Sequence, residues 1–401
     1  RDDITLREAC GNTVRNVTAS ETAGIDPDEP FDVTPYADAV FRYFLRNPIC
    51  QELGRKFKIS FSSSDRDSAL SYMHDLGFMP KIRKEKTGDI EGFKIMIAGG
   101  LGSQPRHADI LFDFLEADRI IPLIESVLRI FDRHGERNRR ARARMKHLIG
   151  NLGLDRFREL LEAEQKTLSS QSVTTEEDDA LGIRTSRFSE VPQVTIEDFE
   201  AFKIWKSSNV ISQKQAGLFA IGIKVRLGDF FTDKARSLAH LIKDYASNEI
   251  RLTIGQGILI RDVPEGSLPF FYEQLKELDF ADPGYQSTLD ITSCPGTDTC
   301  NLGIASSTGL SRVLENTLLK EFPQFVHDKN LNIKISGCMY SCGQHSIAAI
   351  GFYGMSIKNG NVVIPGFQIL LGGSNEGNGK ARFADKVIKI PSKRGPNALR
   401  I

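Results

Sequence analysis

The chain has 401 residues, of which 40% are hydrophobic and 26% are charged, and its 52 basic residues balance its 52 acidic ones. This length accommodates two or three domains, and the balanced charge excludes a global positive field that would attract nucleic acid. No apolar run of 18 or more residues predicts a membrane span, and the first residues lack the features of a secretory signal. We therefore expect a soluble protein of the cytoplasm, or of a plastid interior.

The order of predicted elements along the chain indicates four parts. A first α/β segment contains strand-like runs and ends in a helical stretch, and a polar, aperiodic linker follows it. Strand, helix, strand and helix then alternate at short spacing, which is typical of half of a ferredoxin-like sandwich. A second α/β segment closes the chain. The expected boundaries are 1–168, 169–204, 205–284 and 285–401.

An internal repeat connects the two α/β segments. Residues 4–16 resemble 289–301, residues 55–67 resemble 332–344, and 92–102 resemble 366–377. The octamer EADRIIPL (116–123) also resembles FADKVIKI (383–390). The fold class expected from this is α+β, a pseudo-twofold duplication of α/β domains with a ferredoxin-like half-domain between them. A half-domain should also precede the first copy, so we expect the chain to lack a leading unit.

Four of the six cysteines fall into two close pairs in the second copy. Cys294 and Cys300 have five residues between them, and Cys338 and Cys342 have three. Zinc sites usually use tighter knuckles, whereas glycine-rich loops of this kind let thiolates converge on an iron–sulfur cube. We predict a [4Fe-4S] cluster held by the four cysteines. A zinc site and unligated buried thiols are the alternatives.

These motifs resemble those of the siroheme-dependent sulfite and nitrite reductases. The resemblance covers nearly the whole chain and rests on the two cysteine pairs, on TVRNV (13–17) and RKFK (55–58) in the other copy, and on their order. It implies that siroheme and the [4Fe-4S] cluster are coupled through a shared thiolate, which by motif position is that of Cys342. Met339 and Tyr340 depart from the Pro and Asn common in the family.

The resemblance also implies the residues that bind the substrate anion. By motif position these are Arg15, Lys56 and Lys58, with Arg55 pairing with a siroheme carboxylate. Alternation along a strand supports this, because residues two apart face the same side. A buried oxyanion requires cations of this kind, and a lysine can also donate protons. The alternative is an edge strand protected by lysines.

Further siroheme contacts are expected in two places. Residues 249–260 resemble the family strand that runs beside the macrocycle, and the glycine-rich stretch 372–382 offers backbone amides and two cations. A plain solvent loop is the alternative for the second stretch. The side chains predicted to contact siroheme are those of Arg251, Thr253, Gln256, Lys380 and Arg382.

The expected function is the six-electron reduction of sulfite to sulfide. Lys58 favours sulfite, because nitrite-specific members often have Asn at that position, and nitrite reduction to ammonia is the alternative. A non-catalytic iron–sulfur electron carrier is a second alternative. The expected partners are the small anion and an electron donor such as ferredoxin or a flavoprotein, with no nucleic acid and no membrane. The basic run 137–146 is predicted to be a solvated helix face or a docking surface for an acidic donor.

Overall fold

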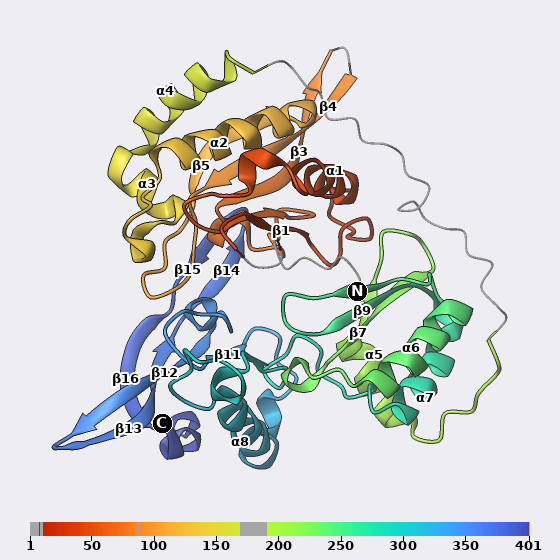
Figure 1. The fold of residues 1–401 in the computed structure, drawn as a ribbon. Coiled ribbons are helices and arrows are strands. Elements are labelled where there is room, and N and C mark those ends of the chain that lie inside the picture. The colour runs from red at the N-terminus through yellow and green to blue at the C-terminus, as the bar shows by residue number, and fades with distance from the viewer. Residues whose placement is uncertain (1–7, 9–10, 87, 169–190, 401) are drawn as a thin grey trace, which may run out of the picture. The chain divides into compact units, whose positions relative to one another are not determined.

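The computed structural model describes residues 8, 11–86, 88–168 and 191–400 (Figure 1). These residues form two compact units. Of the described residues, the first unit contains those up to 168 except Leu101–Gln104, together with Glu376–Lys380. The second contains those from 191 onward except Glu376–Lys380, together with Leu101–Gln104. Among the described residues, no helix is long and apolar enough to cross a membrane.

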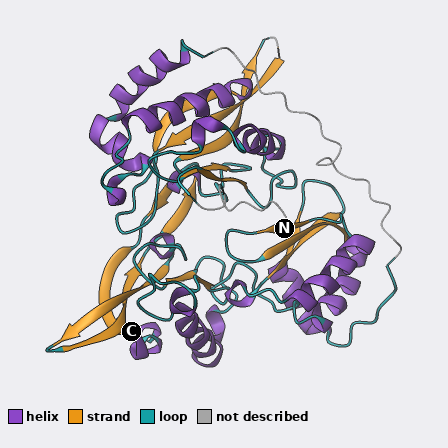
Figure 2. Cartoon of the chain, viewed as in Figure 1, coloured by secondary structure: helices purple, strands orange, loops and turns teal. Residues whose placement is uncertain are grey.

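The first unit is built on a five-stranded sheet of order β1-β2-β3-β4-β5, in which β1, β2 and β3 are parallel and β4 and β5 are antiparallel additions. Its strands are β1 (Val14–Ala19), β2 (Phe57–Phe61), β3 (Leu76–Glu85), β4 (Gly88–Ile97) and β5 (Asp109–Glu116). Its helices are α1 (Thr34–Phe44), α2 (Ile120–His134), α3 (Met145–Leu152) and α4 (Leu154–Gln165). Figure 2 shows these helices around the sheet.

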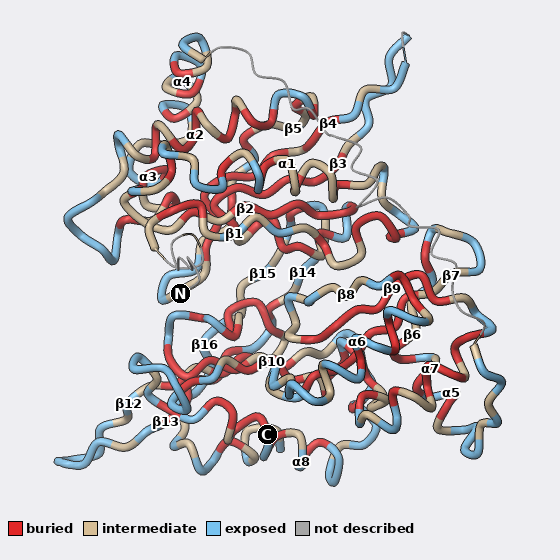
Figure 3. The backbone as a smooth tube through the Cα atoms, turned by 45° about the vertical axis from the view of Figure 1, so that its right-hand side comes forward, coloured by how far each residue is buried: buried red, intermediate tan, exposed pale blue. Residues whose placement is uncertain are grey.

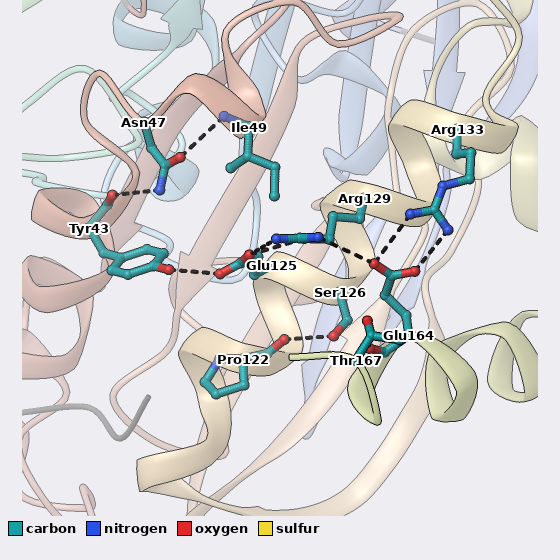
Figure 4. Close-up of polar contacts among 10 residues, drawn as sticks. All are labelled: Tyr43, Asn47, Ile49, Pro122, Glu125, Ser126, Arg129, Arg133, Glu164 and Thr167. Atoms are coloured by element: carbon teal, nitrogen blue, oxygen red, sulfur yellow. Dashed lines mark hydrogen bonds and ion pairs between the residues drawn. The ribbon is translucent and has the colours of Figure 1, made fainter. Parts of the chain in front are cut away.

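Helix α2 forms because its apolar residues recur every three or four positions and so line one buried face. The helix ends at Gly135, whose N–H donates to the Phe131 carbonyl oxygen, and a Cβ there would lie 2.4 Å from that oxygen. On its polar side, Glu125 accepts hydrogen bonds from Tyr43 of α1 and from Arg129, while Arg133 pairs with the buried Glu164 of α4 (Figure 4). These contacts join three helices over the sheet.

The second unit contains the half-domain and the second α/β copy. The half-domain sheet has the antiparallel order β6-β7-β9-β8, and its core is shared with three helices. Its elements are α5 (Phe199–Asn209), β6 (Val210–Ser212), β7 (Leu218–Ile223), α6 (Thr232–Tyr245), β8 (Ile250–Leu252), β9 (Ile258–Pro264) and α7 (Leu268–Glu277). The strand predicted over 249–260 is therefore two strands joined by a turn.

The second copy repeats the sheet of the first with the order β10-β11-β12-β13-β16 and the same strand directions. Buried residues run through the central strands of both sheets (Figure 3). Its elements are β10 (Thr292–Ser293), α8 (Ser307–Glu321), β11 (Ile333–Ser336), β12 (Ile350–Asn359), β13 (Val362–Leu371), β14 (Ser374–Gly377), β15 (Lys380–Arg382) and β16 (Asp385–Pro391).

The predicted duplication is confirmed, and strand pairing fixes its register. The β3–β4 hairpin pairs Leu76 with Ile97 and the β12–β13 hairpin pairs Ile350 with Leu371, so equivalent residues lie 274 positions apart. Of the sequence matches, only 92–102 with 366–377 begins at this offset. The match of 55–67 with 332–344 is displaced from this register by a few residues. The tripeptide KIS occurs in both β2 and β11, but its two copies lie two positions out of register.

Two other predictions of local structure were wrong. EADRIIPL ends a strand and begins α2, whereas FADKVIKI leads into and forms β16, so these octamers are not equivalent. The apolar run in GQHSIAAIGF (343–352) predicts a helix after Cys342, but the structure has a single 3-10 turn there, followed by the strand β12. The apolar run there belongs to a buried sheet, and its sequence alone does not separate a buried strand from a helix.

Candidate functional site

The four clustered cysteines follow the carboxyl ends of two neighbouring parallel strands of the second copy. Cys294 comes directly after β10, and Cys338 follows β11 by two residues. Parallel strands end at the same edge of a sheet, which brings the two loops together. The Cys294 sulfur accepts a hydrogen bond from the Gly337 N–H at 3.1 Å, and its own N–H donates to the Ile335 carbonyl oxygen at 3.1 Å. The first loop is thus held directly against the second.

The Cys338 thiol lies close enough to the other three cysteines for their charges to affect its pKa. Burial raises the pKa of the Cys338 thiol, and repulsion from Cys342, Cys294 and Cys300 raises it further, while the backbone N–H of Tyr340 lowers it. None of the four is in a disulfide. Thiols gathered in this way fit a centre whose iron charge would stabilise the thiolates.

Glycines allow the cysteine loops to approach each other closely. A Cβ on Gly343 would lie 1.9 Å from the Ile335 carbonyl oxygen, and one on Gly337 would lie 2.6 Å from the Gly296 Cα. Gly296 itself has a φ of +53°, and a Cβ there would meet the Ser307 hydroxyl at 2.2 Å. Any larger residue would push the loops apart, so these glycines are a requirement of the site.

The first unit gathers the predicted anion-binding residues at the start of β1 and β2. Asn16 pairs with Lys58 across the two strands, with a β-bulge at Arg15. Phe57 and Ile59 are buried, so Lys58 lies on the other side of β2, and strand alternation predicts that side for Lys56, which directly precedes the strand. Parallel pairing with β1 and β3 makes β2 an internal strand, which excludes the reading of these lysines as edge protection.

The cations in this cluster interact with one another. Burial lowers the pKa of Lys56 to about 8, and the charges of Arg144, Lys58, Arg15 and Arg55 contribute further. A lysine with a pKa near neutrality can donate a proton and regain it at physiological pH. An anion bound beside these charges would be stabilised by all of them.

Sequence reasoning missed three members of this cluster. The basic run 137–146 is not a helix, because only a 3-10 turn covers Arg140–Arg142 and α3 begins at Met145. Its end turns inward, where Arg144 donates to the buried Asp75 carboxylate at 2.8 and 3.3 Å. Asp75 also accepts from the Lys58 N–H at 3.0 Å.

Lys146 is the third missed residue, with only 7% of its surface exposed. Burial lowers its pKa to about 8, the charges of Arg144 and Arg106 act in the same direction, and Asp75 opposes them. The alternation of Arg144 and Lys146 on either side of the apolar Met145 was the available signal. It was obscured by the surface arginines that precede it.

Three other residues predicted to contact siroheme bind groups of the protein itself in this structure. Arg251 pairs with Glu249 at 3.1 Å, and the Thr253 hydroxyl accepts from the Gly257 N–H at 2.9 Å within the β8–β9 turn. The Gln256 amide binds both backbone groups of Ser293 at 2.8 Å, directly before Cys294. Gln256 thereby fixes the strand that presents the first cysteine.

The glycine-rich stretch predicted as a siroheme cradle forms the hairpin β14–β15. Residues 376–380 group with the first unit, where the Lys94 ammonium donates to the Asn378 backbone and side-chain oxygens at 3.0 Å. Lys380 is exposed, and Arg382 pairs with Asp385 at 2.7 Å. The role of Lys380 and Arg382 toward siroheme stays a prediction.

A duplicated α/β sheet, a ferredoxin-like half-domain and four neighbouring thiols define an iron–sulfur protein of the reductase type. The family described as "Nitrite and sulphite reductase 4Fe-4S domain" matches residues 10–168 and 284–398, and the "Nitrite/Sulfite reductase ferredoxin-like half domain" matches 211–278. The chain therefore belongs to the siroheme-dependent nitrite and sulfite reductase family. The predicted family, fold class and cofactor pair are confirmed.

Individual relatives divide between the two substrates. The chain is 30% identical over 381 residues to the assimilatory ferredoxin-dependent nitrite reductase of Haloferax mediterranei, covering 92% of this chain and 61% of that protein. It is 27% identical over 373 residues to sulfite reductase [ferredoxin] 1 of Mycolicibacterium paratuberculosis, with 91% and 61% covered. The solved structure of the Mycobacterium tuberculosis NirA protein matches with a TM-score of 0.76 at 26% identity, covering 98% of this chain and 67% of that one. The chain thus spans less than two thirds of the length of the first two relatives.

Proposed function

We propose that the protein reduces sulfite to sulfide at siroheme coupled to a [4Fe-4S] cluster, and that Cys294, Cys300, Cys338 and Cys342 hold the cluster. When bound, siroheme would supply an iron site for the substrate anion, and the cluster held by these cysteines would supply one-electron redox chemistry beside it. Family membership and the neighbouring thiols support this assignment. We also propose four parts of the chain: a first α/β domain over 1–168, a linker over 169–204, the ferredoxin-like half-domain over 205–284 and the cluster-carrying α/β domain over 285–401.

The observation that carries the proposal is the partly buried cation cluster of the first unit. Reduction of sulfite takes six electrons, and its three oxygens leave as water, so the site must bind an anion and supply protons repeatedly. Arg15 and Lys58 provide fixed positive charge, and Lys56, with a pKa of about 8, can exchange a proton near neutral pH. A non-catalytic electron carrier would need its iron–sulfur cluster but not this group of buried cations.

Nitrite is the second candidate substrate, because the Haloferax mediterranei relative is named a nitrite reductase. Lys58 favours sulfite, the more highly charged anion at neutral pH, since an added cation stabilises greater negative charge more strongly. The proposed donor is a one-electron carrier such as ferredoxin, which the names of several relatives specify. We place the reaction in a reducing compartment, the cytoplasm or a plastid interior, because thiolate ligands must stay reduced.

The test compares turnover of sulfite and nitrite with reduced methyl viologen in the wild-type protein and in Lys58→Asn. We expect the variant to lose sulfite turnover more than tenfold relative to nitrite turnover, a change of more than about 1.4 kcal/mol in discrimination. The matched control is Lys84→Asn, which changes an exposed lysine of β3. Equal losses on both anions would contradict the role of Lys58, and absence of an extractable tetrapyrrole would contradict siroheme chemistry.

A further inference from the structure

The 274-residue register places the cluster cysteines on specific residues of the first copy. Cys294, Cys300, Cys338 and Cys342 correspond to Ser20, Asp26, Ser64 and Ser68. The sequence match of 4–16 with 289–301 places Cys10 near Cys294 and Arg15 near Cys300, and the 274-residue register shows that these are not the counterparts. Cys10 lies outside the described residues.

Hydrogen bonds confirm this correspondence independently of the strands. The Ser63 N–H donates to the Ser20 hydroxyl at 3.0 Å, as the Gly337 N–H donates to the Cys294 sulfur at 3.1 Å. Ser20 N–H donates to the Phe61 carbonyl oxygen at 2.9 Å, and the same bond joins the equivalent backbone atoms of the second copy at 3.1 Å.

The backbone of the two loops also matches. Asp67 and Leu70 have φ angles of +52° and +56°, and their counterparts Ser341 and Gln344 both have +61°. Non-glycine residues rarely adopt this conformation, so its recurrence at two equivalent positions shows that the loops share one path. The first copy therefore retains the loop geometry of the cluster site without its sulfur ligands.

The oxygen side chains at these positions bind one another. The Ser64 hydroxyl donates to Asp26 Oδ2 at 2.8 Å, and the Ser63 hydroxyl donates to the same atom at 2.8 Å. The Ser20 and Ser68 hydroxyls lie 2.6 Å apart. Asp26 is 3% exposed, and its second oxygen pairs with Arg66.

We propose that Ser20, Asp26, Ser64 and Ser68 form a metal-free counterpart of the cluster site, which we call the oxygen staple. It joins the loop after β1 to the loop 62–75 with hydrogen bonds and one ion pair, where the second copy uses a cluster. The comparison rests on the proposed cluster ligands, but the staple itself consists only of the bonds described above. The loop 62–75 is thereby held in place whether or not iron is present.

The staple has a functional consequence because the same loop ends at Asp75. Asp75 binds both the Lys58 N–H and Arg144 of the cation cluster, and its counterpart in the second copy is Ala349. In the second copy, this loop carries the proposed cluster ligands near its start. In the first copy, the equivalent loop ends at Asp75, which holds the cations Lys58 and Arg144 and is called the cation anchor. The staple positions this anchor without metal.

The first experiment measures hydrogen exchange of the full chain with its cofactors and after iron removal by a chelator. We expect residues 62–75 of the wild type to keep their protection after iron removal, whereas residues 337–343 lose theirs. In Asp26→Ala, exchange of residues 62–75 should rise at least about tenfold with iron present. The matched control is Asp28→Ala, because Asp28 also pairs with Arg66 but is 67% exposed. Ser64→Ala provides a milder change if the first variant does not fold.

Two results would overturn the staple. One is loss of protection of residues 62–75 in the wild type on iron removal, and the other is wild-type exchange of these residues in both Asp26→Ala and Ser64→Ala. A separate measurement tests whether the staple positions Asp75. It follows the acetylation of Lys56 as a function of pH by mass spectrometry. If Asp26→Ala loosens Asp75 and Arg144, the pKa of Lys56 should rise from about 8 toward 10.5, while Asp28→Ala leaves it unchanged. An unchanged pKa in Asp26→Ala would overturn the positioning role. None of these readouts depends on turnover, so they can fail while the proposed reductase activity stands.

A second experiment tests the equivalence of the four positions. The variant Ser20→Cys, Asp26→Cys, Ser64→Cys and Ser68→Cys also needs the glycines of the cluster loops, so it is made with Thr22→Gly, Ser63→Gly and Ala69→Gly, which stand opposite Gly296, Gly337 and Gly343. This variant should bind a second cluster, which raises iron per chain about twofold. The same changes made with Cys338→Ser should restore iron–sulfur absorbance that Cys338→Ser alone has lost. A folded variant that gains no iron would overturn the equivalence.

Discussion

Removing the Asp75 carboxylate should destabilise the first unit strongly. Asp75 is fully buried and accepts three hydrogen bonds, from the Lys58 N–H at 3.0 Å and from the Arg144 guanidinium at 2.8 and 3.3 Å. Asp75→Ala leaves the Arg144 charge and the Lys58 N–H without their acceptor. It also removes a negative charge that raises the pKa of Lys146.

The size of the effect follows from the burial of both partners. Breaking a buried ion pair by removing one member costs about 3–5 kcal/mol. The Arg144 side chain is 18% exposed and can recover part of its hydration, which places the loss at the lower end, about 3 kcal/mol. Guanidinium denaturation followed by circular dichroism would measure this loss.

The matched control is Asp65→Ala, which removes a carboxylate from the same loop. Asp65 pairs with Lys81 at 2.6 Å, but its side chain is 58% exposed, so the expected loss is about 0.5 kcal/mol. A loss below about 1 kcal/mol for Asp75→Ala, or one equal to the control, would refute the reasoning that burial makes this pair essential.

Three further predictions concern pH, the cluster and the loops. Because the pKa values of Lys56 and Lys146 fall from 10.5 to about 8 on folding, the unfolded chain binds more protons between about pH 8 and 10.5, and these lysines should make stability rise with pH in that window. This slope, measured by denaturant midpoints, should disappear when both lysines are changed to Met. Cys338→Ser should abolish the iron–sulfur absorbance, and retention of full iron content would contradict its role as a ligand. Gly343→Ala should likewise reduce iron content, because the added Cβ meets a carbonyl oxygen at 1.9 Å, whereas Gly150→Ala in α3 has open space and should leave iron content unchanged.

The sequence by itself determined the chemistry of this protein. Four cysteines in two close pairs, a repeated α/β segment and the RKFK motif led to the family and the cofactors, and they predicted which residues bind the anion. These signals were readable because iron–sulfur cubes are usually held by four thiolates, and because a strand places alternate residues on one face. The position of Lys56 and Lys58 on one side of β2 follows from that periodicity alone.

Only the tertiary structure decided the register of the duplication and the members of the cation cluster. Two KIS tripeptides suggested one alignment, but the pairing of whole hairpins selected another, since each residue of a strand is constrained by its partner as well as its neighbours. Arg144 and Asp75 are 69 positions apart, and no local pattern relates them. Contacts of this kind arise from how the chain folds back on itself, so the oxygen staple and the buried ion pair could be recognised only in three dimensions.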